Sequence, residues 1–271
     1  MLAEGFAEAS DFLEPEPATD DDMLLVHERS WIQQLKNGTL SYADILRLEI
    51  PYSQKMVEGA WLAAGGTILA ARRALTDRIG FNIGGGFHHA FSGHGEGFCA
   101  IHDVAVAIRR LQRDGAIRKA LIVDCDVHHG NGTAAVFADD PSVYTISLHQ
   151  FSNYPAIKPP SSVDIHLNDG AGDQEYMAEL RAAYPPAIAA FQPGLIVYLA
   201  GADPYEQDQL GGLSLTLDGL LARDRLVFDA ALEHRTPVAV TLAGGYAVRT
   251  EDTVTIHCNT ARAARDSLLA S

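Results

Sequence analysis

Two aspartates and a histidine at alternate positions are the residues of this 271-residue chain whose types and spacing point to metal chemistry. In the run Asp124-Cys-Asp-Val-His, residues two apart project to the same side of an extended chain. Asp126 and His128 can therefore present an oxygen and a nitrogen to one ion, and Asp203 can supply a third ligand. Two carboxylates and one imidazole leave a coordination position open, as a catalytic zinc requires. The alternative is that the aspartates cap helices and His128 is a surface residue.

A histidine pair, His88-His89, directly follows Gly84-Gly-Gly-Phe. Adjacent imidazoles suit general acid–base catalysis, because their ordinary pKa lies near ~6.5. The glycines allow the backbone to approach a ligand closely, which would also suit a phosphate. No Lys-Ser/Thr follows them and the GxGxxG spacing is absent, so a phosphate cradle is disfavoured. An ordinary pair of loop histidines remains the alternative.

Tyr246 follows two glycines, which would let its hydroxyl reach a developing oxyanion, although packing alone would also account for such a tyrosine. Seven of the eleven histidines lie between residues 88 and 149, which favours metal or acid–base chemistry there. The chain has no Gly-x-Ser-x-Gly motif, so an esterase-type serine nucleophile has little support.

These side chains need a scaffold that brings distant segments together. Apolar runs of strand length alternate with helical repeats, which predicts an α/β fold with a parallel sheet covered by helices on both faces. The predicted strands are 79–83, 120–124, 143–147, 195–200 and 237–242. The predicted helices are 23–36, 54–76, 101–111, 173–191 with a kink or an interruption at Pro185-Pro186, 216–235 and 249–270.

The polar residues singled out above lie at or just past the C-terminal ends of these predicted strands. Ser147 and His149 do so as well, at the end of the third strand. Sites of open α/β sheets are built at this edge, so we expect these side chains to meet there. The long loop 149–172 follows directly and is of a length typical of functional loops.

Composition restricts the partners. The formal net charge is −15, and residues 1–22 hold eight acidic residues and no lysine or arginine. We therefore divide the chain into an acidic segment, 1–22, with a flexible or surface stretch at 11–22, and an α/β catalytic domain, 23–271. Nucleic acid and anionic membrane surfaces need clustered basic residues, so neither is an expected partner. The uncharged run 182–202 is broken by proline and glycine, which argues against a membrane helix. Three scattered cysteines indicate a reducing cytoplasm.

Six motifs in order along the chain resemble those of the zinc-dependent histone deacetylase family, especially the bacterial deacetylase-like amidohydrolases and class IV deacetylases. The resemblance covers roughly residues 20–265. The motifs are GGGFHHA (84–90), GEGFCAIHD (95–103), VDCDVHHGNGT (123–133), TISLH (145–149), AGADPYEQDQLGGLSLT (200–216) and LAGGYA (242–247).

This resemblance implies a single-domain arginase/deacetylase-like fold and removal of an acyl group from a lysine-like amine. Asp126, His128 and Asp203 match the zinc ligands, one Zn²⁺ per chain. The zinc polarises the amide carbonyl and acidifies water. His88 and His89 match the tandem catalytic histidines, with His89 as the general base and acid.

The remaining matches concern residues around this centre. Tyr246 matches the tyrosine that stabilises the oxyanion, and Gly97 and Phe98 match the wall of the acyl-lysine tunnel. Asp124 matches the carboxylate that orients the first histidine. A K⁺ or Na⁺ site is also implied, formed by Asp124, Asp126, His128, Ser147 and Leu148.

The chain departs from the family pattern in three places. Asn131 stands where many members carry an aspartate behind the second histidine, so we expect His89 to be less basic. Family members usually have a first strand and loop upstream of the matched part, so we expect a more open site or a shortened chain. The loop 149–172 matches least, which leaves the second wall of the tunnel unassigned.

The sequence leaves several functions open. The expected substrate is an acylated lysine peptide, a polyamine or another small acylated amine, with an acetylpolyamine or metabolite amidohydrolase as the first alternative. An inactive module that binds acyl-lysine is an alternative of another class. A dinuclear-metal ureohydrolase of the same fold would need further carboxylate ligands, for which Asp208 is the clearest candidate.

Overall fold

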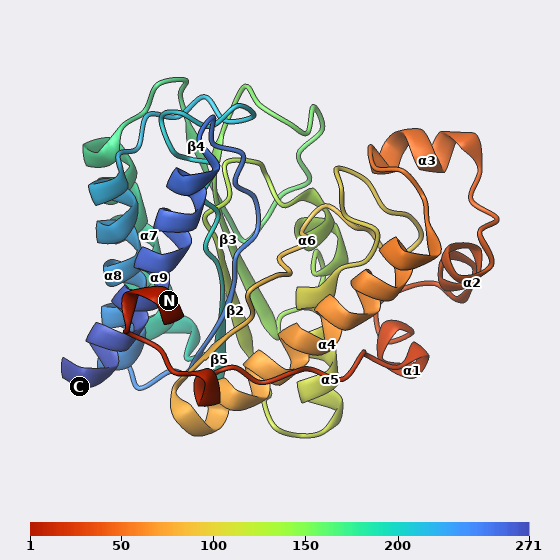
Figure 1. Cartoon of the computed structure of the whole chain (residues 1–271), viewed down its shortest axis with the longest axis horizontal. Helices are drawn as coiled ribbons and strands as arrows, with labels where there is room; N and C mark the ends of the chain where they lie inside the picture. Colours follow the sequence, from red (N-terminus) through yellow and green to blue (C-terminus); the bar gives the residue numbers. More distant parts are fainter. Residues whose placement is uncertain (271) are drawn as a thin grey trace.

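The structure, a computed structural model, describes residues 1–270 and contains within them one six-stranded sheet in which all neighbouring strands are parallel (Figure 1). The strand order is β1-β6-β5-β2-β3-β4. The strands are β1 (Ile79–Phe81), β2 (Ala120–Asp124), β3 (Val143–Gln150), β4 (Val163–Leu167), β5 (Leu195–Leu199) and β6 (Val238–Thr241). The predicted α/β fold with a parallel sheet is therefore confirmed.

Helices cover both faces of this sheet. They are α1 (Asp20–Met23), α2 (Arg29–Asn37), α3 (Tyr42–Leu48), α4 (Gln54–Asp77), α5 (Asp103–Arg113), α6 (Asn131–Val136), α7 (Asp173–Phe191), α8 (Leu217–Glu233) and α9 (Thr250–Ala270). Two short 3₁₀ turns, Leu2–Glu4 and Ala9–Asp11, precede them.

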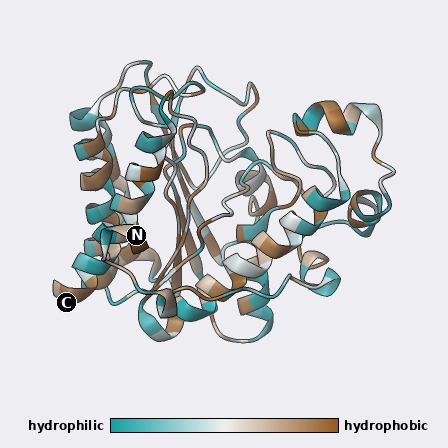
Figure 2. Ribbon diagram, viewed as in Figure 1, coloured by the Kyte–Doolittle hydropathy of each residue, from teal (hydrophilic) through white to brown (hydrophobic). Residues whose placement is uncertain are grey.

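Alternate residues of the central strands divide the core into two layers. Leu121 and Val123 of β2 pack with α7, α8 and α9, whereas Ala120 and Ile122 pack with α4 and α5. Because both faces are covered, the central strands β2 and β5 are apolar almost throughout, and Figure 2 shows the brown centre of the sheet against the teal outer faces of the helices. The sheet therefore positions polar residues mainly in the loops at the ends of its strands.

The strand order contains a reversal between β2 and β5. From β2 the chain moves outward through β3 to β4, and it then returns to the other side of β2 to form β5 and β6. Asp124 at the end of β2 pairs in register with Leu199 of β5. The loops that leave these two neighbouring strands diverge, which makes their C-terminal ends a natural place for a binding site.

The predicted helix 23–36 is wrong in its first half. The chain forms α1, leaves the helix at Leu24 and begins α2 only at Arg29. Tertiary hydrogen bonds account for the break: the Glu28 amide donates to the Ser92 carbonyl, and His27 Nε2 accepts from the His102 amide. These bonds attach the turn to the loop 91–102, and the local helical pattern cannot show them.

The other predicted strands and helices are confirmed, with small shifts at their ends. Of the two expectations for Pro185-Pro186 in α7, a kink or an interruption, the interruption is wrong. The helix runs through Pro185 and Pro186 without a break. Tyr184, Ala187 and Ile188 are buried, while Pro186 is exposed. Packing of one face against the core therefore outweighs the local cost of the prolines.

Three elements were not predicted. The strand β4 lies inside the expected loop 149–172, and α3 and α6 lie outside every predicted helix. β4 is only partly buried because it forms the edge of the sheet beside β3, and its burial pattern carries no clear alternation. Edge strands of this kind give a weak sequence signal.

The acidic segment begins beside α9, where Arg262 donates to Glu4 at 2.6 Å, and then follows the surface beside α4 (Figure 1). Its interpretation as flexible or superficial is wrong at the C-terminal end, where Ala18 and Asp22 are buried. Asp22 forms ion pairs with Arg110 and, at 3.0 Å, with Arg113 of α5. Among residues 1–270, no helix has the length and apolar character needed to cross a membrane.

Candidate active site

A cavity of about 250 Å³ opens at the C-terminal edge of the sheet. The loops that follow β1, β2, β5 and β6 all contribute to it, although they are far apart in sequence. It is lined, among others, by His88, His89, Asp126, His128, Asp203 and Tyr246. The structure therefore brings the predicted metal ligands, the histidine pair and the tyrosine to one place.

Asp126, His128 and Asp203 offer ligand atoms that all lie within 4.8 Å of one another. Asp126 and Asp203 are each held by a backbone amide, from Gly244 at 2.9 Å and Val127 at 2.8 Å respectively. Each aspartate is thereby fixed with its second oxygen toward His128, whose Nδ1 lies 3.0 Å from Asp126 Oδ1 and 3.5 Å from Asp203 Oδ2.

The chemistry of this group suits a cation. Asp203 is fully buried, and its Oδ2 has no hydrogen-bond partner among residues 1–270. Burial, and then repulsion from Asp126, raises the pKa of Asp203 above its usual value. Two buried carboxylates beside an imidazole form a donor set that fits a zinc ion, with room for a further ligand on the cavity side.

A buried ion pair between Arg223 and Asp224 holds the backbone of the segment that carries Asp203. Arg223 of α8 donates through Nη1 to the Gly201 carbonyl at 2.6 Å and pairs through Nη2 with Asp224 at 2.9 Å. Asp224 in turn accepts from the Tyr198 hydroxyl of β5. The sequence gives no signal for this support, because its members are neighbours only in the folded chain.

The two histidines differ in their partners. His88 Nδ1 lies 2.7 Å from Asp124 Oδ2, whereas His89 Nδ1 lies 2.7 Å from Asn131 Oδ1. Burial by itself lowers the pKa of His88, but attraction to Asp124 and Asp126 overcomes it and raises the pKa to about 9. Burial, and then the neighbouring His88, holds the pKa of His89 well below its usual value.

The low pKa of His89 has causes beyond the one inferred from sequence, which was the asparagine in place of an aspartate. The bond to Asn131 raises the pKa of His89, but burial and the neighbouring His88 have larger effects and lower it. His89 is consequently neutral at pH 7, which is the form that can accept a proton. The geometry suits a base at His89 and a charged neighbour at His88.

A buried carboxylate that sequence analysis did not identify holds the backbone before the histidine pair. Asp103, the first residue of α5, accepts from the amides of Gly86 at 3.0 Å and Phe87 at 2.8 Å and from the Thr67 hydroxyl at 2.5 Å. Gly86 has a φ of 88°, which a side chain would strain. Asp103 thereby fixes the loop that carries the histidine pair, because it accepts from the backbone amides of that loop.

We predict that Asp103→Ala lowers the free energy of unfolding by about 3 kcal/mol, because it leaves buried donors without an acceptor. Urea unfolding monitored by circular dichroism measures this change. Asp114→Ala, near the end of the same helix, is the matched control and should cost less than about 1 kcal/mol, because its ion pairs are at the surface. Equal losses in the two variants would contradict the prediction.

The predicted tunnel residues Gly97 and Phe98 line the cavity, and the loop 149–172 contributes Tyr154 to its wall next to Gly97. The ring centroid of Tyr154 lies 4.9 Å from that of His89. A Cβ on Gly97 would stand 2.8 Å from the His89 ring and 3.0 Å from the Tyr154 ring, so only glycine fits. Tyr154 is a site residue that sequence analysis missed.

Tyr246 stands at the mouth of the cavity. Its ring lies 6.0 Å from that of Phe98, and about two fifths of the residue is exposed. Burial, and then the negative charge of Asp126 and Asp203, raises the pKa of Tyr246 above its usual value. Its hydroxyl is therefore protonated at neutral pH and is available as a hydrogen-bond donor.

Asp208 does not extend the metal group. Its Oδ1 accepts from the backbone amides of Leu210 at 2.8 Å and Gly211 at 3.0 Å. Its Oδ2 accepts from the backbone amide of Tyr246. Asp208 thus organises the loop that carries Tyr246. Because its oxygens are engaged by the backbone, the geometry gives no support to the ureohydrolase alternative.

The residues of the predicted monovalent-cation site lie on β2, β3 and the loop after β2. Asp124 and Ser147 pair in register across these strands, with Leu148 next along β3. Ser147 Oγ is hydrogen-bonded to His149 Nδ1 at 2.9 Å, and Asp124 is engaged by His88. The K⁺ or Na⁺ site remains a prediction.

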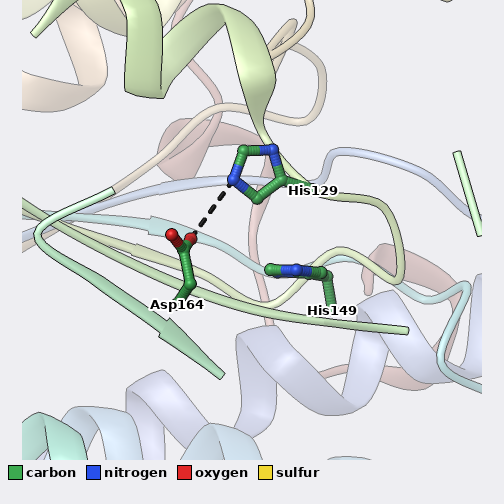
Figure 3. A group of neighbouring side chains, drawn as sticks. All are labelled: His129, His149 and Asp164. Atoms are coloured by element: carbon green, nitrogen blue, oxygen red, sulfur yellow. Dashed lines mark hydrogen bonds and ion pairs between the residues drawn. The ribbon is translucent and has the colours of Figure 1, made fainter. Parts of the chain in front are cut away.

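A second group of possible ligands, His129, His149 and Asp164, comes from the loop after β2, from β3 and from β4 (Figure 3). His129 Nε2 lies 3.2 Å from Asp164 Oδ1, and His149 Nε2 lies 2.8 Å from His166 Nδ1. These contacts, with that of His149 to Ser147, form a network that ties the loop after β2 to β3 and β4. We interpret the group as structural support.

Comparison with known proteins places this architecture in a family. The model of the histone deacetylase domain matches residues 1–261. Histone deacetylase 2 of Arabidopsis thaliana is 33% identical over 256 residues, which cover 91% of this chain and 66% of that protein. The histone deacetylase-like amidohydrolase of Pseudomonas aeruginosa is 30% identical over 246 residues, 85% of this chain and 64% of that protein.

Solved structures give the same result for the fold. The HDA15 HD domain superposes with a TM-score of 0.78 at 26% identity, covering 96% of this chain and 77% of that one. A deacetylase homologue of Aquifex aeolicus has a TM-score of 0.81 at 24% identity, covering 98% and 79%. The chain belongs to the histone deacetylase family and has the arginase/deacetylase fold. It is accordingly a hydrolase that acts on amide bonds.

Proposed function

We propose that this protein is a zinc-dependent deacylase that removes an acetyl or longer acyl group from an acylated lysine or a related amine, in the cytoplasm. The observation that carries the proposal is the convergence, in one cavity, of three metal-type ligands, a neutral histidine and a protonated tyrosine. Asp126, His128 and Asp203 would hold the zinc. When bound there, zinc polarises the amide carbonyl and acidifies water.

The protein's own residues supply the proton transfers and part of the charge stabilisation. His89 takes a proton from the attacking water and later gives it to the leaving amine. His88, positively charged beside Asp124, adds a favourable field for the developing negative charge. Tyr246 donates its hydroxyl hydrogen bond to the oxyanion.

The nature of the amine is a separate question. A lysine peptide, an acetylated polyamine and a small acylated metabolite present the same amide to this cavity. A panel of acetyl to long-chain acyl groups on peptide and polyamine amines, assayed with added zinc, tests the proposal. Release of the acyl group from at least one of them is expected. Binding of acyl-lysine without any release would favour the inactive binding module instead.

We predict that Tyr246→Phe lowers kcat by about 10²- to 10³-fold, because it removes one donor to the oxyanion. The zinc content should be unchanged, since the hydroxyl is not one of the grouped ligands. Steady-state kinetics together with metal analysis measures both quantities. Tyr42→Phe, on the exposed face of α3, is the matched control. An unchanged kcat in Tyr246→Phe would remove the proposed oxyanion role.

A further inference from the structure

The partner of His89 is chemically ambiguous. An asparagine can turn either its oxygen or its nitrogen toward an imidazole, and the two choices impose opposite tautomers. Only if the oxygen of Asn131 faces Nδ1 does His89 carry its hydrogen there and keep a free lone pair on Nε2. In a serine protease triad, replacement of the aspartate by asparagine is costly because the wrong tautomer results. An asparagine at this position therefore needs something to fix its orientation.

Two groups with only one hydrogen-bonding role fix Asn131. The Gly132 amide can only donate, and it lies 3.1 Å from Oδ1. The Glu96 carboxylate accepts from Nδ2 through its Oε1. Together they require the oxygen of Asn131 to face His89, at 2.7 Å. A chain of hydrogen bonds therefore runs from His89 to Asn131 and from Asn131 to the carboxylate of Glu96.

Glu96 is itself held in place for this contact. The Tyr154 hydroxyl donates to the same Oε1 at 3.2 Å, and His94 Nε2 lies 3.5 Å from Oε2. The Glu96 side chain is only 15% exposed, so its charge acts in a partly desolvated place. Glu96 lies in the loop that also carries Gly97 and Phe98, within the segment GEGF.

We propose that Glu96 is a positioning residue of the reaction, which acts through Asn131 to hold His89 in the tautomer whose Nε2 accepts a proton. This inference rests on the proposed function for its effect on turnover, but not for its effect on the tautomer. The negative charge of Glu96 also polarises the Asn131 amide, so that Oδ1 becomes a stronger acceptor. The asparagine and the glutamate together do what a single aspartate would do in direct contact.

The proposal predicts a reversal of sign in a double-mutant cycle. With Asn131 present, Glu96→Gln should lower kcat by about tenfold or more. Glutamine can present either its oxygen or its nitrogen to the Asn131 side chain, so it no longer fixes which end of Asn131 faces His89. Asn131→Asp should also be impaired, because it sets two carboxylates against each other. In that second background Glu96→Gln should raise kcat, because its amide can donate to the new aspartate. A purely structural role for Glu96 would give losses in both backgrounds.

The experiment combines this cycle with a measurement that needs no substrate. Zinc-loaded protein labelled with ¹⁵N-histidine reports the tautomer of His89, assigned by loss of its signals in His89→Ala. The wild type should show Nδ1–H, and Glu96→Gln should show a shift toward Nε2–H. Glu58→Gln, on the exposed surface of α4, controls for the loss of one charge.

Either of two results would overturn the proposal. One is an unchanged tautomer in Glu96→Gln, and the other is a loss of kcat on Glu96→Gln that is equal in the wild-type and Asn131→Asp backgrounds. Failure of the wild type to act on every acyl substrate would instead overturn the proposed function. The tautomer measurement stands in either case, so the two failures are distinguishable.

Discussion

Replacing His89 with alanine is expected to lower kcat on an acyl-lysine peptide by about 10⁴-fold, the largest loss we predict for a side chain that does not bind metal. His89 has to act twice, as the base toward water and as the acid toward the leaving amine, so both proton transfers lose their catalyst. His88 cannot replace it, because attraction to Asp124 and Asp126 raises the pKa of His88 to about 9 and keeps it protonated at pH 7. Steady-state kinetics measures the loss.

The zinc content separates this effect from damage to the metal group. His89 is not among the grouped ligands, so His89→Ala should bind zinc like the wild type. His234→Ala, at the exposed end of α8, is the matched control and should leave kcat unchanged. If His89→Ala retained more than a tenth of the wild-type kcat, the general base would have to be another group.

Removal of the metal is the second change with a very large expected effect. We predict one zinc per chain, lost together with turnover on exhaustive chelation and restored by added zinc. Asp203→Asn should prevent the restoration, because it removes a ligand charge with little change in shape. Asp203 also accepts from the Val127 amide through Oδ1, a bond that the asparagine oxygen can keep. Inductively coupled plasma mass spectrometry and activity after reconstitution provide the two measurements.

The network of His129, His149 and Asp164 supplies the control for this prediction. Asp164→Asn makes the same chemical change in the second group of possible ligands, and it should leave the zinc content at one per chain. Two zinc ions in the wild type and one in Asp164→Asn would show that this network binds metal. Full activity after exhaustive chelation would contradict the zinc dependence itself.

The fold was largely predictable because its signals are local. The fully buried strands β2 and β5 appear as unbroken apolar runs, and the long amphipathic or alanine-rich helices show their repeats over many residues. β4 and the break before α2 were missed for the opposite reason. The first is a half-exposed edge strand, and the second is imposed by bonds from Glu28 and His27 to the loop 91–102.

The candidate site was predictable to the extent that its residues carry their chemistry in short motifs. Alternation in an extended segment places Asp126 and His128 on one side, and adjacent histidines identify themselves. The supporting roles have no such signature. Glu96 and Asp103 lie within the motif GEGFCAIHD and Tyr154 lies outside every motif, but the roles of all three depend on contacts with residues that are distant along the chain.

The sequence by itself determined the family, the parallel sheet and the side chains that meet at its edge, because hydrophobic periodicity and motif spacing are properties of the local chain. The tertiary structure alone decided the strand order, which brings Asp203, just after β5, beside Asp126, just after β2. It also decided that Asn131 turns its oxygen to His89. That orientation depends on Glu96 and on the Gly132 amide, and hydrogen bonds between loops are set by the packing of the whole chain.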